Sequence, residues 1–325
     1  MAENFFHTIE SESSISRPPS QRDYQWDALF RVIAKSAAGF VILLLAFILW
    51  QLFIDAIPAI SHSGLGFFTG TTWDGVKGEF GVLPEIWGTL YSSMIALFLG
   101  GIFGIFIAIF LTQDFISARL ASVFRTIVEL LAAIPSVVYG LWGIYVLIPI
   151  MRPIASWLHE QLGFIPFFNT NLNGPGLAPA ALVLSIMILP TVAALSVDAF
   201  RRIPYKVKEA AYGMGTTRWE AILKVMMPTA SSGILAALVL AFGRALGETM
   251  ALAMLIGNSN QINLSLFAPA NTLASLLASN FPEAGIVEIQ ALMYAALVLL
   301  LITFLVNVLG LLIQQLAMRK FEGKS

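Results

Sequence analysis

Charged residues are scarce in this chain. Only 11% of its 325 residues are Asp, Glu, Lys or Arg, whereas soluble domains contain about 25%. Hydrophobic residues make up 58%, which leaves too few polar side chains to cover a water-exposed surface. The composition therefore excludes an ordinary soluble domain and predicts an integral membrane protein.

Several kinds of site are also missing. The absence of cysteine excludes disulfides, thiolate metal sites and a cysteine nucleophile. The histidines, His7, His62 and His159, are too far apart in sequence to suggest a metal site. No Ser/His/Asp arrangement or carboxylate pair suggests catalysis. Gly323-Lys324-Ser325 lacks the earlier glycine of a P-loop, so we expect this chain to bind neither ATP nor another cofactor.

Six apolar runs are long enough to cross a membrane, which takes about 20 helical residues. They are Ile33–Ile57, Ile86–Leu111, Ser122–Ile150, Leu177–Val197, Ala230–Gly257 and Ile289–Leu316. We therefore predict an all-α, polytopic membrane protein with six transmembrane helices. Residues 1–27 are polar and Ser-rich and are expected to form a mobile cytoplasmic tail, followed by one membrane domain over residues 28–325.

The distribution of basic residues predicts the orientation. Fifteen of the 18 Lys and Arg residues fall before the first span, after the last, or in the loops that follow spans two and four. Lys77 and Arg152 lie on the other side, and Arg244 lies inside the fifth span. Because basic residues accumulate on the cytoplasmic side, both termini and the segment between spans four and five are predicted to be cytoplasmic.

Two segments on the predicted outer side carry helix patterns. Apolar residues recur at helical spacing in Pro153–Leu162, which is typical of an amphipathic helix at the membrane surface. In the polar stretch 258–285, Asn271 or Thr272 is expected to cap a short helix over Leu273–Ser279.

The cytoplasmic segment between spans four and five predicts a short helix. Pro204 precedes Tyr205–Met214, which is rich in helix formers and is followed by Gly215. Small apolar side chains lie on one face at Val207, Ala210, Ala211 and Met214. Such a face fits a groove in another subunit. The alternative is a solvated loop helix that only contributes positive charge.

The same segment resembles a family signature. Bacterial ABC importer permeases carry the signature E-A-A-x3-G-x9-I-x-L-P. This chain has a similar pattern: Glu209-Ala210-Ala211, three residues, Gly215, nine residues and then Val225-x-Met227-Pro228. Val225 and Met227 depart from the family's Ile and Leu but remain apolar. The resemblance implies a coupling helix that docks into an ATPase subunit, with Glu209, Ala210, Ala211 and Gly215 as its coupling residues.

The fifth span contains two charged residues, Arg244 and Glu248. At i, i+4 they are expected on one helix face, and an unpaired charge at such a depth costs at least about 2.5–3.5 kcal/mol. A guanidinium fork matches two oxygens of a passing oxyanion, and Glu248 would hold Arg244 when no anion is bound. The alternative is an ion pair that locks helices together, with Gly243-xxx-Gly247 as a packing seam.

Pro135 is expected to kink the third span. Ser136 and Tyr139 lie beside it and are, with Pro135, weaker candidates for lining a path; a kink that serves packing alone is the alternative. Near the cytoplasmic end of span four, Asp198 is expected to pair with Arg201 or Arg202.

Two longer stretches are similar to the phosphate ABC permeases of the PstC type. They are Glu129–Gly140, and Gly243–Met254 with Gly257-Asn258. The resemblance covers nearly the whole chain after the tail. The related PstA type usually continues its Arg-Ala-x-Gly-Glu-Thr motif with Ala-Pro, where this chain has Met250-Ala251. In the family the intramembrane Arg and Glu are implicated in phosphate passage, which the resemblance assigns to Arg244 and Glu248.

The resemblance implies a non-catalytic permease subunit of an ATP-driven phosphate importer in a bacterial inner membrane, with residues 28–325 as the permease domain. It implies three protein partners besides lipid: a PstA-like permease, a PstB-like ATPase dimer that binds ATP-Mg, and an extracytoplasmic PstS-like phosphate-binding protein. No nucleic acid is expected. The alternatives are a permease for sulfate or molybdate, an ion-coupled transporter, and a membrane phosphate sensor without transport.

Overall fold

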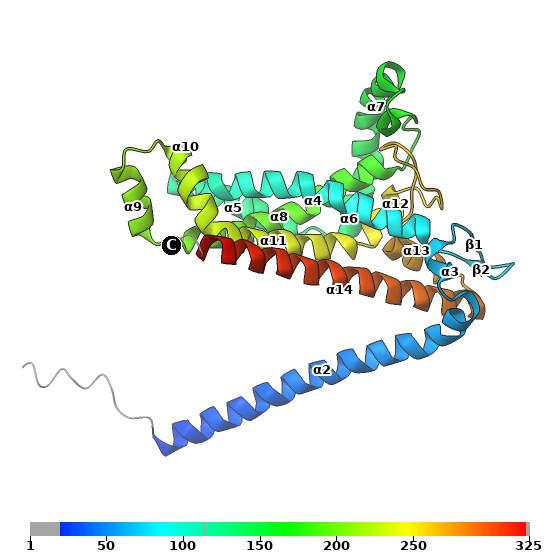
Figure 1. Ribbon diagram of the computed structural model, residues 1–325, viewed down its shortest axis with the longest axis horizontal. Helices are drawn as coiled ribbons and strands as arrows, with labels where there is room; N and C mark the ends of the chain where they lie inside the picture. Colours follow the sequence, from blue (N-terminus) through cyan, green and yellow to red (C-terminus); the bar gives the residue numbers. More distant parts are fainter. Residues whose placement is uncertain (1–19, 114, 323–325) are drawn as a thin grey trace, which may run out of the picture. The chain divides into compact units, whose positions relative to one another are not determined.

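A computed structural model of the chain describes residues 20–113 and 115–322 (Figure 1). Within this part nearly all regular structure is helical, and the strands are the two-residue β1 (Trp73–Asp74) and β2 (Glu79–Phe80). Six helical runs are long and apolar enough to cross a membrane. The prediction of an all-α chain with six spans is therefore confirmed.

The chain divides into two units between Ile54 and Asp55. The first unit contains most of α2 (Gln21–Ser63), whose apolar middle is the first candidate span. At its start, Ser20 and Asp23 accept hydrogen bonds from each other's backbone N–H groups, an arrangement that caps helices. The helix therefore begins earlier than the predicted tail boundary at residue 27, and residues 1–19 of that tail lie outside the described residues.

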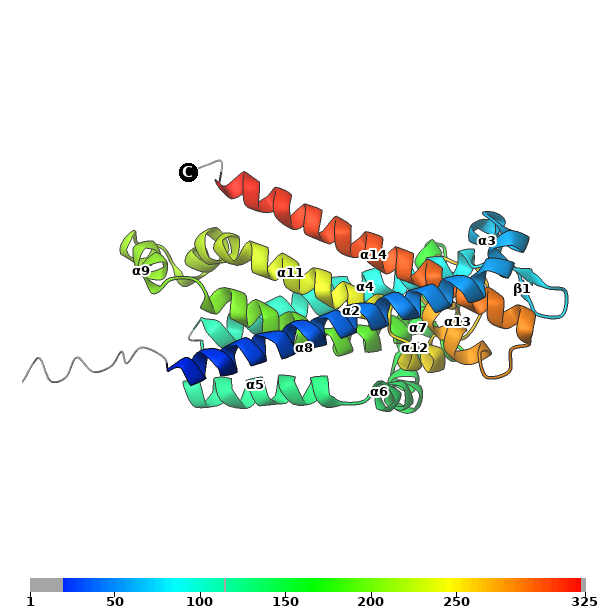
Figure 2. The same ribbon diagram turned by 90° about the horizontal axis from the view of Figure 1, so that it is seen from below.

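The second unit is organised around α8 (Leu177–Arg201). This helix packs against α4 (Leu83–Thr112) and α11 (Met227–Leu246), and α11 packs in turn on α14 (Ile286–Glu322) (Figures 1 and 2). In the most apolar window of each span, 67% of the residues of α8 are buried against 11% of those of α14. The core of the unit therefore lies along α8.

Glycines on α4 allow close contact with α8. A Cβ added to Gly100 would stand 2.7 Å from the Ser185 carbonyl oxygen, and one on Gly104 would stand 2.8 Å from the Val192 Cβ. Small residues four apart allow membrane helices to approach this closely. A packing seam of small residues therefore runs along α4 where it contacts α8.

A prediction follows for Gly88, in the second turn of α4. A Cβ there would fall 1.9 Å from the backbone carbonyl oxygen of Asn271, so Gly88→Ala must displace backbone and is expected to destabilise the fold by about 1–3 kcal/mol. Thermal unfolding of the purified protein in detergent measures this. The control is Gly39→Ala, where a helical Cβ meets open space and no loss is expected; equal melting temperatures for both variants would contradict the prediction.

The third span differs from its predicted range of Ser122–Ile150. The chain forms α5 (Ala118–Ala133), breaks at Ile134–Pro135 and continues as α6 (Ser136–Trp142), the π-helical turn η1 (Gly143–Leu147) and α7 (Ile148–Leu162). The candidate span is Ser136–Leu162, because Pro135 ends one helix and starts another instead of kinking one. The predicted surface helix Pro153–Leu162 is the second half of α7, which projects away from the direction of α4 and α14 (Figure 1).

The end of the second unit opposite α9 carries the short elements. They are α3 (Gly66–Thr69), the β1–β2 hairpin, η2 (Pro166–Phe168) and α13 (Leu273–Asn280). Phe67 stacks on Tyr294 of α14 with ring centroids 4.2 Å apart. Thr272 caps α13, because its hydroxyl accepts a hydrogen bond from the backbone N–H of Ser275. The predicted cap is therefore confirmed.

Candidate functional site

The predicted fifth span, Ala230–Gly257, is not one helix. α11 ends at Leu246, three residues follow, and α12 (Met250–Leu255) begins after them. In the other direction, α10 (Arg218–Glu220) and the π-helical η3 (Ala221–Met226) run into α11, so the candidate span is Arg218–Leu246. The predicted range is wrong at both ends. Broken helices within membranes are tolerated where the freed backbone groups face protein or a water-filled cavity.

Arg244 lies in the last turn of α11 and its side chain is exposed. Its Nη1 donates a hydrogen bond of 3.2 Å to the hydroxyl of Thr191 on α8. The C-terminal end of a helix dipole favours a positive charge, which lowers the cost of keeping Arg244 in an apolar region. Among residues 20–113 and 115–322 its other N–H donors have no hydrogen-bond partner, which leaves them available to bind an anion.

Glu248 does not pair with Arg244. The break removes the i, i+4 geometry, and the Glu248 Oε1 instead accepts a hydrogen bond of 3.3 Å from the backbone N–H of Ala251 at the start of α12. In the described parts of the chain, the ion pairs are Arg31–Asp27, Lys77–Asp74 and Lys224–Glu220. The expected Arg244–Glu248 pair is therefore wrong, and each of the two residues lies at the helix end whose dipole favours its charge.

The alternative of a Gly243-xxx-Gly247 packing seam is supported at Gly243 and not at Gly247. An added Cβ on Gly247 would meet only atoms of its own turn, at 3.9 Å, and one on Gly243 would stand 3.3 Å from the Asn307 Oδ1 of α14. Asn307 and Thr191 were missed from sequence. The available signal was a polar side chain inside an otherwise apolar run on a neighbouring span.

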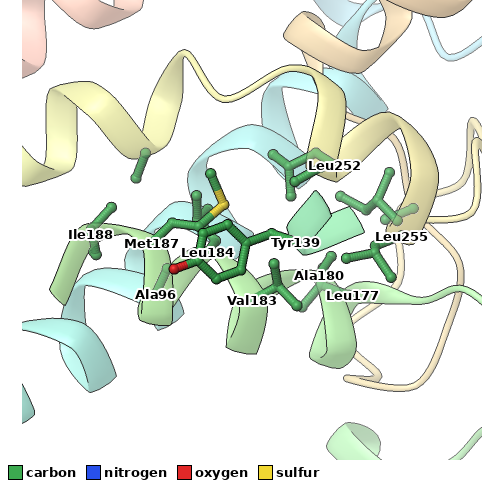
Figure 3. Packing of buried hydrophobic residues seen from close by; sticks show 14 of the residues in the cluster. Ala96, Tyr139, Leu177, Ala180, Val183, Leu184, Met187, Ile188, Leu252 and Leu255 are labelled. Atoms are coloured by element: carbon green, nitrogen blue, oxygen red, sulfur yellow. The ribbon is translucent and has the colours of Figure 1, made fainter. Parts of the chain in front are cut away.

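The residues around Pro135 divide between surface and core. Pro135 is exposed and Ser136 is half-buried. Tyr139 is buried, with its ring among Leu184, Met187 and Leu252 (Figure 3), and its hydroxyl donates a hydrogen bond to the Leu131 carbonyl oxygen. In this conformation Tyr139 packs in the core, and its role in lining a path stays a prediction.

The segment resembling a coupling helix is helical, as predicted, and forms α9 (Tyr205–Gly213). The predicted apolar face of α9 is partly buried and partly exposed. Ala211 is buried against Ile222 and Met226 of η3, whereas Glu209 and Ala210 are exposed. One side of α9 therefore anchors it to the start of the fifth span, and the other is open at the end of the second unit far from α13 (Figure 1).

Gly215 ends this segment because of its backbone conformation. Its φ is +79°, the left-handed conformation that follows many helix C-termini and favours glycine. The N–H and the hydroxyl of Thr216 then both donate hydrogen bonds to the Ala211 carbonyl oxygen. The loop from α9 into α10 depends on this turn.

Gly215→Ala is therefore expected to strain the turn by about 1–2 kcal/mol and to lower the melting temperature of the protein. Gly213→Ala is the matched control, because both positions offer open space to a Cβ and only Gly215 has a positive φ. Thermal unfolding of the two purified variants checks this, and a loss as large for Gly213→Ala would contradict it.

The comparisons with known proteins agree with this architecture. Residues 100–323 match the family described as "Binding-protein-dependent transport system inner membrane component". "Phosphate transport system permease protein PstC" of Mesorhizobium japonicum is 40% identical over 86% of this chain and 87% of its own. The protein of the same name from Haemophilus influenzae is 40% identical over 92% of this chain and 96% of its own.

Two solved structures show the same fold. The MetNI methionine ABC transporter, in an inward-facing conformation, matches 73% of this chain and 95% of its own with a TM-score of 0.54 and 19% identity. A bacterial alginate ABC transporter matches 87% of this chain and 95% of its own with a TM-score of 0.53 and 16% identity. Together with the six apolar spans, these similarities identify a multi-pass membrane protein. The chain belongs to the family of binding-protein-dependent transport system inner membrane components, among its PstC relatives.

Proposed function

We propose that this chain is a permease subunit of an ATP-driven phosphate importer. The observation that carries the proposal is its 35–40% identity, over most of their length, to several permeases named for phosphate transport. The geometry at Arg244 is compatible with that substrate, because an exposed guanidinium beside the Thr191 hydroxyl offers several donors to one oxyanion.

Phosphate would bind at the end of α11 by replacing water and the Thr191 hydroxyl on the Arg244 donors. Glu248 lies four residues further along the chain, and its negative charge opposes a long stay of an anion there. Weak binding of this kind allows release. Passage through a permease requires that each binding site on the path, here called a station, both binds the substrate and releases it.

The conformational change that drives transport would start at α9. A continuous helical run, Arg218–Leu246, joins the segment after α9 to Arg244 over roughly 40 Å at 1.5 Å per residue. A shift of α9 would therefore tilt the helix that holds Arg244. The π-helical η3 lies in this run, and such turns often mark sites of functional bending.

The proposal includes partners and an orientation. A homologous permease of the PstA kind would complete the path, an ATPase dimer holding ATP-Mg would bind Glu209 and Ala210, and an extracytoplasmic phosphate-binding protein would deliver substrate. Both termini and α9 would then be cytoplasmic, in accord with the excess of Lys and Arg on that side.

The test is uptake of labelled phosphate by the complete complex in proteoliposomes, with ATP inside and unlabelled anions as competitors. We expect ATP-dependent uptake that excess phosphate abolishes and excess sulfate or molybdate leaves unchanged. Competition by sulfate or molybdate instead would indicate another oxyanion. Uptake by this chain alone, without ATP, would indicate an ion-coupled transporter, and signalling without uptake would indicate a sensor.

A further inference from the structure

A groove of about 480 Å³ runs between α8 and α11, towards the end of both helices that is near α9. Its wall on α8 includes Leu195, Asp198 and Arg202, and its wall on α11 is made mainly of small residues between Thr229 and Leu240. Asp198, Arg202 and Thr229 are exposed. Pockets for small ligands have volumes of about 300–1,000 Å³, so the groove has room for a small hydrated anion.

The residues that line the groove begin one helical turn from the Arg244 site. Thr191, which binds Arg244, is followed on α8 by Leu195, Asp198 and Arg202 at spacings of four, three and four residues, which places all four on one helix face. Leu240 lies one turn before Arg244 on α11 and lines the groove. Arg202 is 11 residues from Thr191, or roughly 16 Å along the helix.

The charged groups lining this groove are Arg202 and Asp198. The sequence predicted a pair between Asp198 and Arg201 or Arg202, but in the described part of the chain Asp198 forms no ion pair. The Arg202 guanidinium therefore faces the groove without a carboxylate partner. An arginine in this state, exposed in a mainly apolar groove with Thr229 and Ser232 on the facing wall, is suited to bind an oxyanion.

We propose that Arg202 is a second phosphate station, at the inner end of a path formed by the α8–α11 groove and entered at Arg244. The proposal rests on the proposed function. Asp198, one turn away, keeps the net charge of the groove near zero, so an anion arriving from Arg244 is held briefly and then released. Two weak stations about three helical turns apart allow stepwise passage without a deep binding minimum.

The first experiment uses the absence of cysteine from this chain. Ala236 is exposed and lines the groove, so Ala236→Cys gives this chain a single reactive thiol, and the complete complex with the unsubstituted chain is the control for reaction at other subunits. We expect a negatively charged methanethiosulfonate adduct to lower phosphate uptake at least tenfold, and a positively charged adduct of similar size to lower it by less than about threefold. Equal inhibition by both reagents, or no reaction in any state of the transport cycle because a partner helix fills the groove, would overturn the proposal.

The second experiment compares two neighbouring arginines. Arg201 has the same charge and lies next to Arg202 at the end of α8, but it lines two other pockets, both of them with Arg125 of α5. Arg202→Gln is expected to lower the maximal uptake rate at least fivefold at saturating phosphate, whereas Arg201→Gln should leave it within about twofold of wild type. Equal effects of the two substitutions, with equal assembly, would overturn the assignment to Arg202.

These outcomes are separate from a failure of the proposed function. If the wild-type complex takes up a different anion, the competition assay shows that directly. If it takes up phosphate while the two adducts inhibit equally, phosphate transport stands and only the groove assignment is lost.

Discussion

Arg244→Gln is expected to lower phosphate uptake by the assembled complex about 10- to 150-fold. The substitution removes the charge and the fork of donors, and a hydrogen bond to a charged group contributes about 1.5–3 kcal/mol, where about 1.4 kcal/mol is a factor of ten in rate. Glutamine keeps a polar side chain at this exposed position. The end of α11 should therefore remain folded, and the loss should appear in transport and not in assembly.

Glu248 provides the matched control for this prediction. Arg244 and Glu248 form no ion pair in the structure, so Glu248→Gln leaves no uncompensated Arg244 charge, and the double variant should be no more active than Arg244→Gln alone. Initial uptake rates of the four proteins, at equal co-purification of the other subunits, give the comparison. Restored uptake in the double variant would show that the pair locks helices together.

Ala210→Phe is expected to lower ATP-coupled uptake about 5- to 150-fold. Ala210 is exposed on the open side of α9, so a large ring there disturbs no contact within this chain. A close-fitting groove in a partner subunit cannot accept it, because overpacking a well-packed contact costs about 1–3 kcal/mol. The substituted chain should insert and fold normally but fail to couple to ATP hydrolysis.

The control for Ala210→Phe is Ala211→Phe, one position along. Ala211 is buried against η3, so the same ring there must disrupt packing within this chain and lower its yield and melting temperature. The two variants should therefore fail differently: Ala210→Phe at the partner, with normal stability, and Ala211→Phe in folding. Normal ATP-coupled uptake by Ala210→Phe would contradict the assignment of α9 as the helix that docks on the partner subunit.

The number of spans was predictable from sequence because a span needs about 20 apolar residues, and this requirement overrides local detail. The helix α9 was predictable for a different reason: Pro204 and Gly215 limit it on both sides. The sequence could not show which residues of α9 are buried and which are exposed, because this depends on the contacts of Ala211 with η3.

The break at residues 247–249 was missed because apolar residues continue at helical spacing on both sides of it. A glycine within such a pattern is compatible with a continuous helix, and only the tertiary setting decides otherwise. The error mattered for the site, since it placed Arg244 and Glu248 on one face. The proline at position 135 was recognised as a disturbance, but its effect was underestimated, since it separates α5 from α6.

The central claim is that phosphate passes Arg244 at the break between α11 and α12, and a thiol at Gly247 tests it most directly. Gly247 is exposed and has a φ of −94°, so Gly247→Cys should be tolerated, which wild-type uptake by the variant would verify. A hydrophilic maleimide is then applied to the complete complex during ATP turnover. We predict that phosphate slows the labelling several-fold and that Arg244→Gln removes this protection; labelling at the same rate with and without phosphate would contradict the claim.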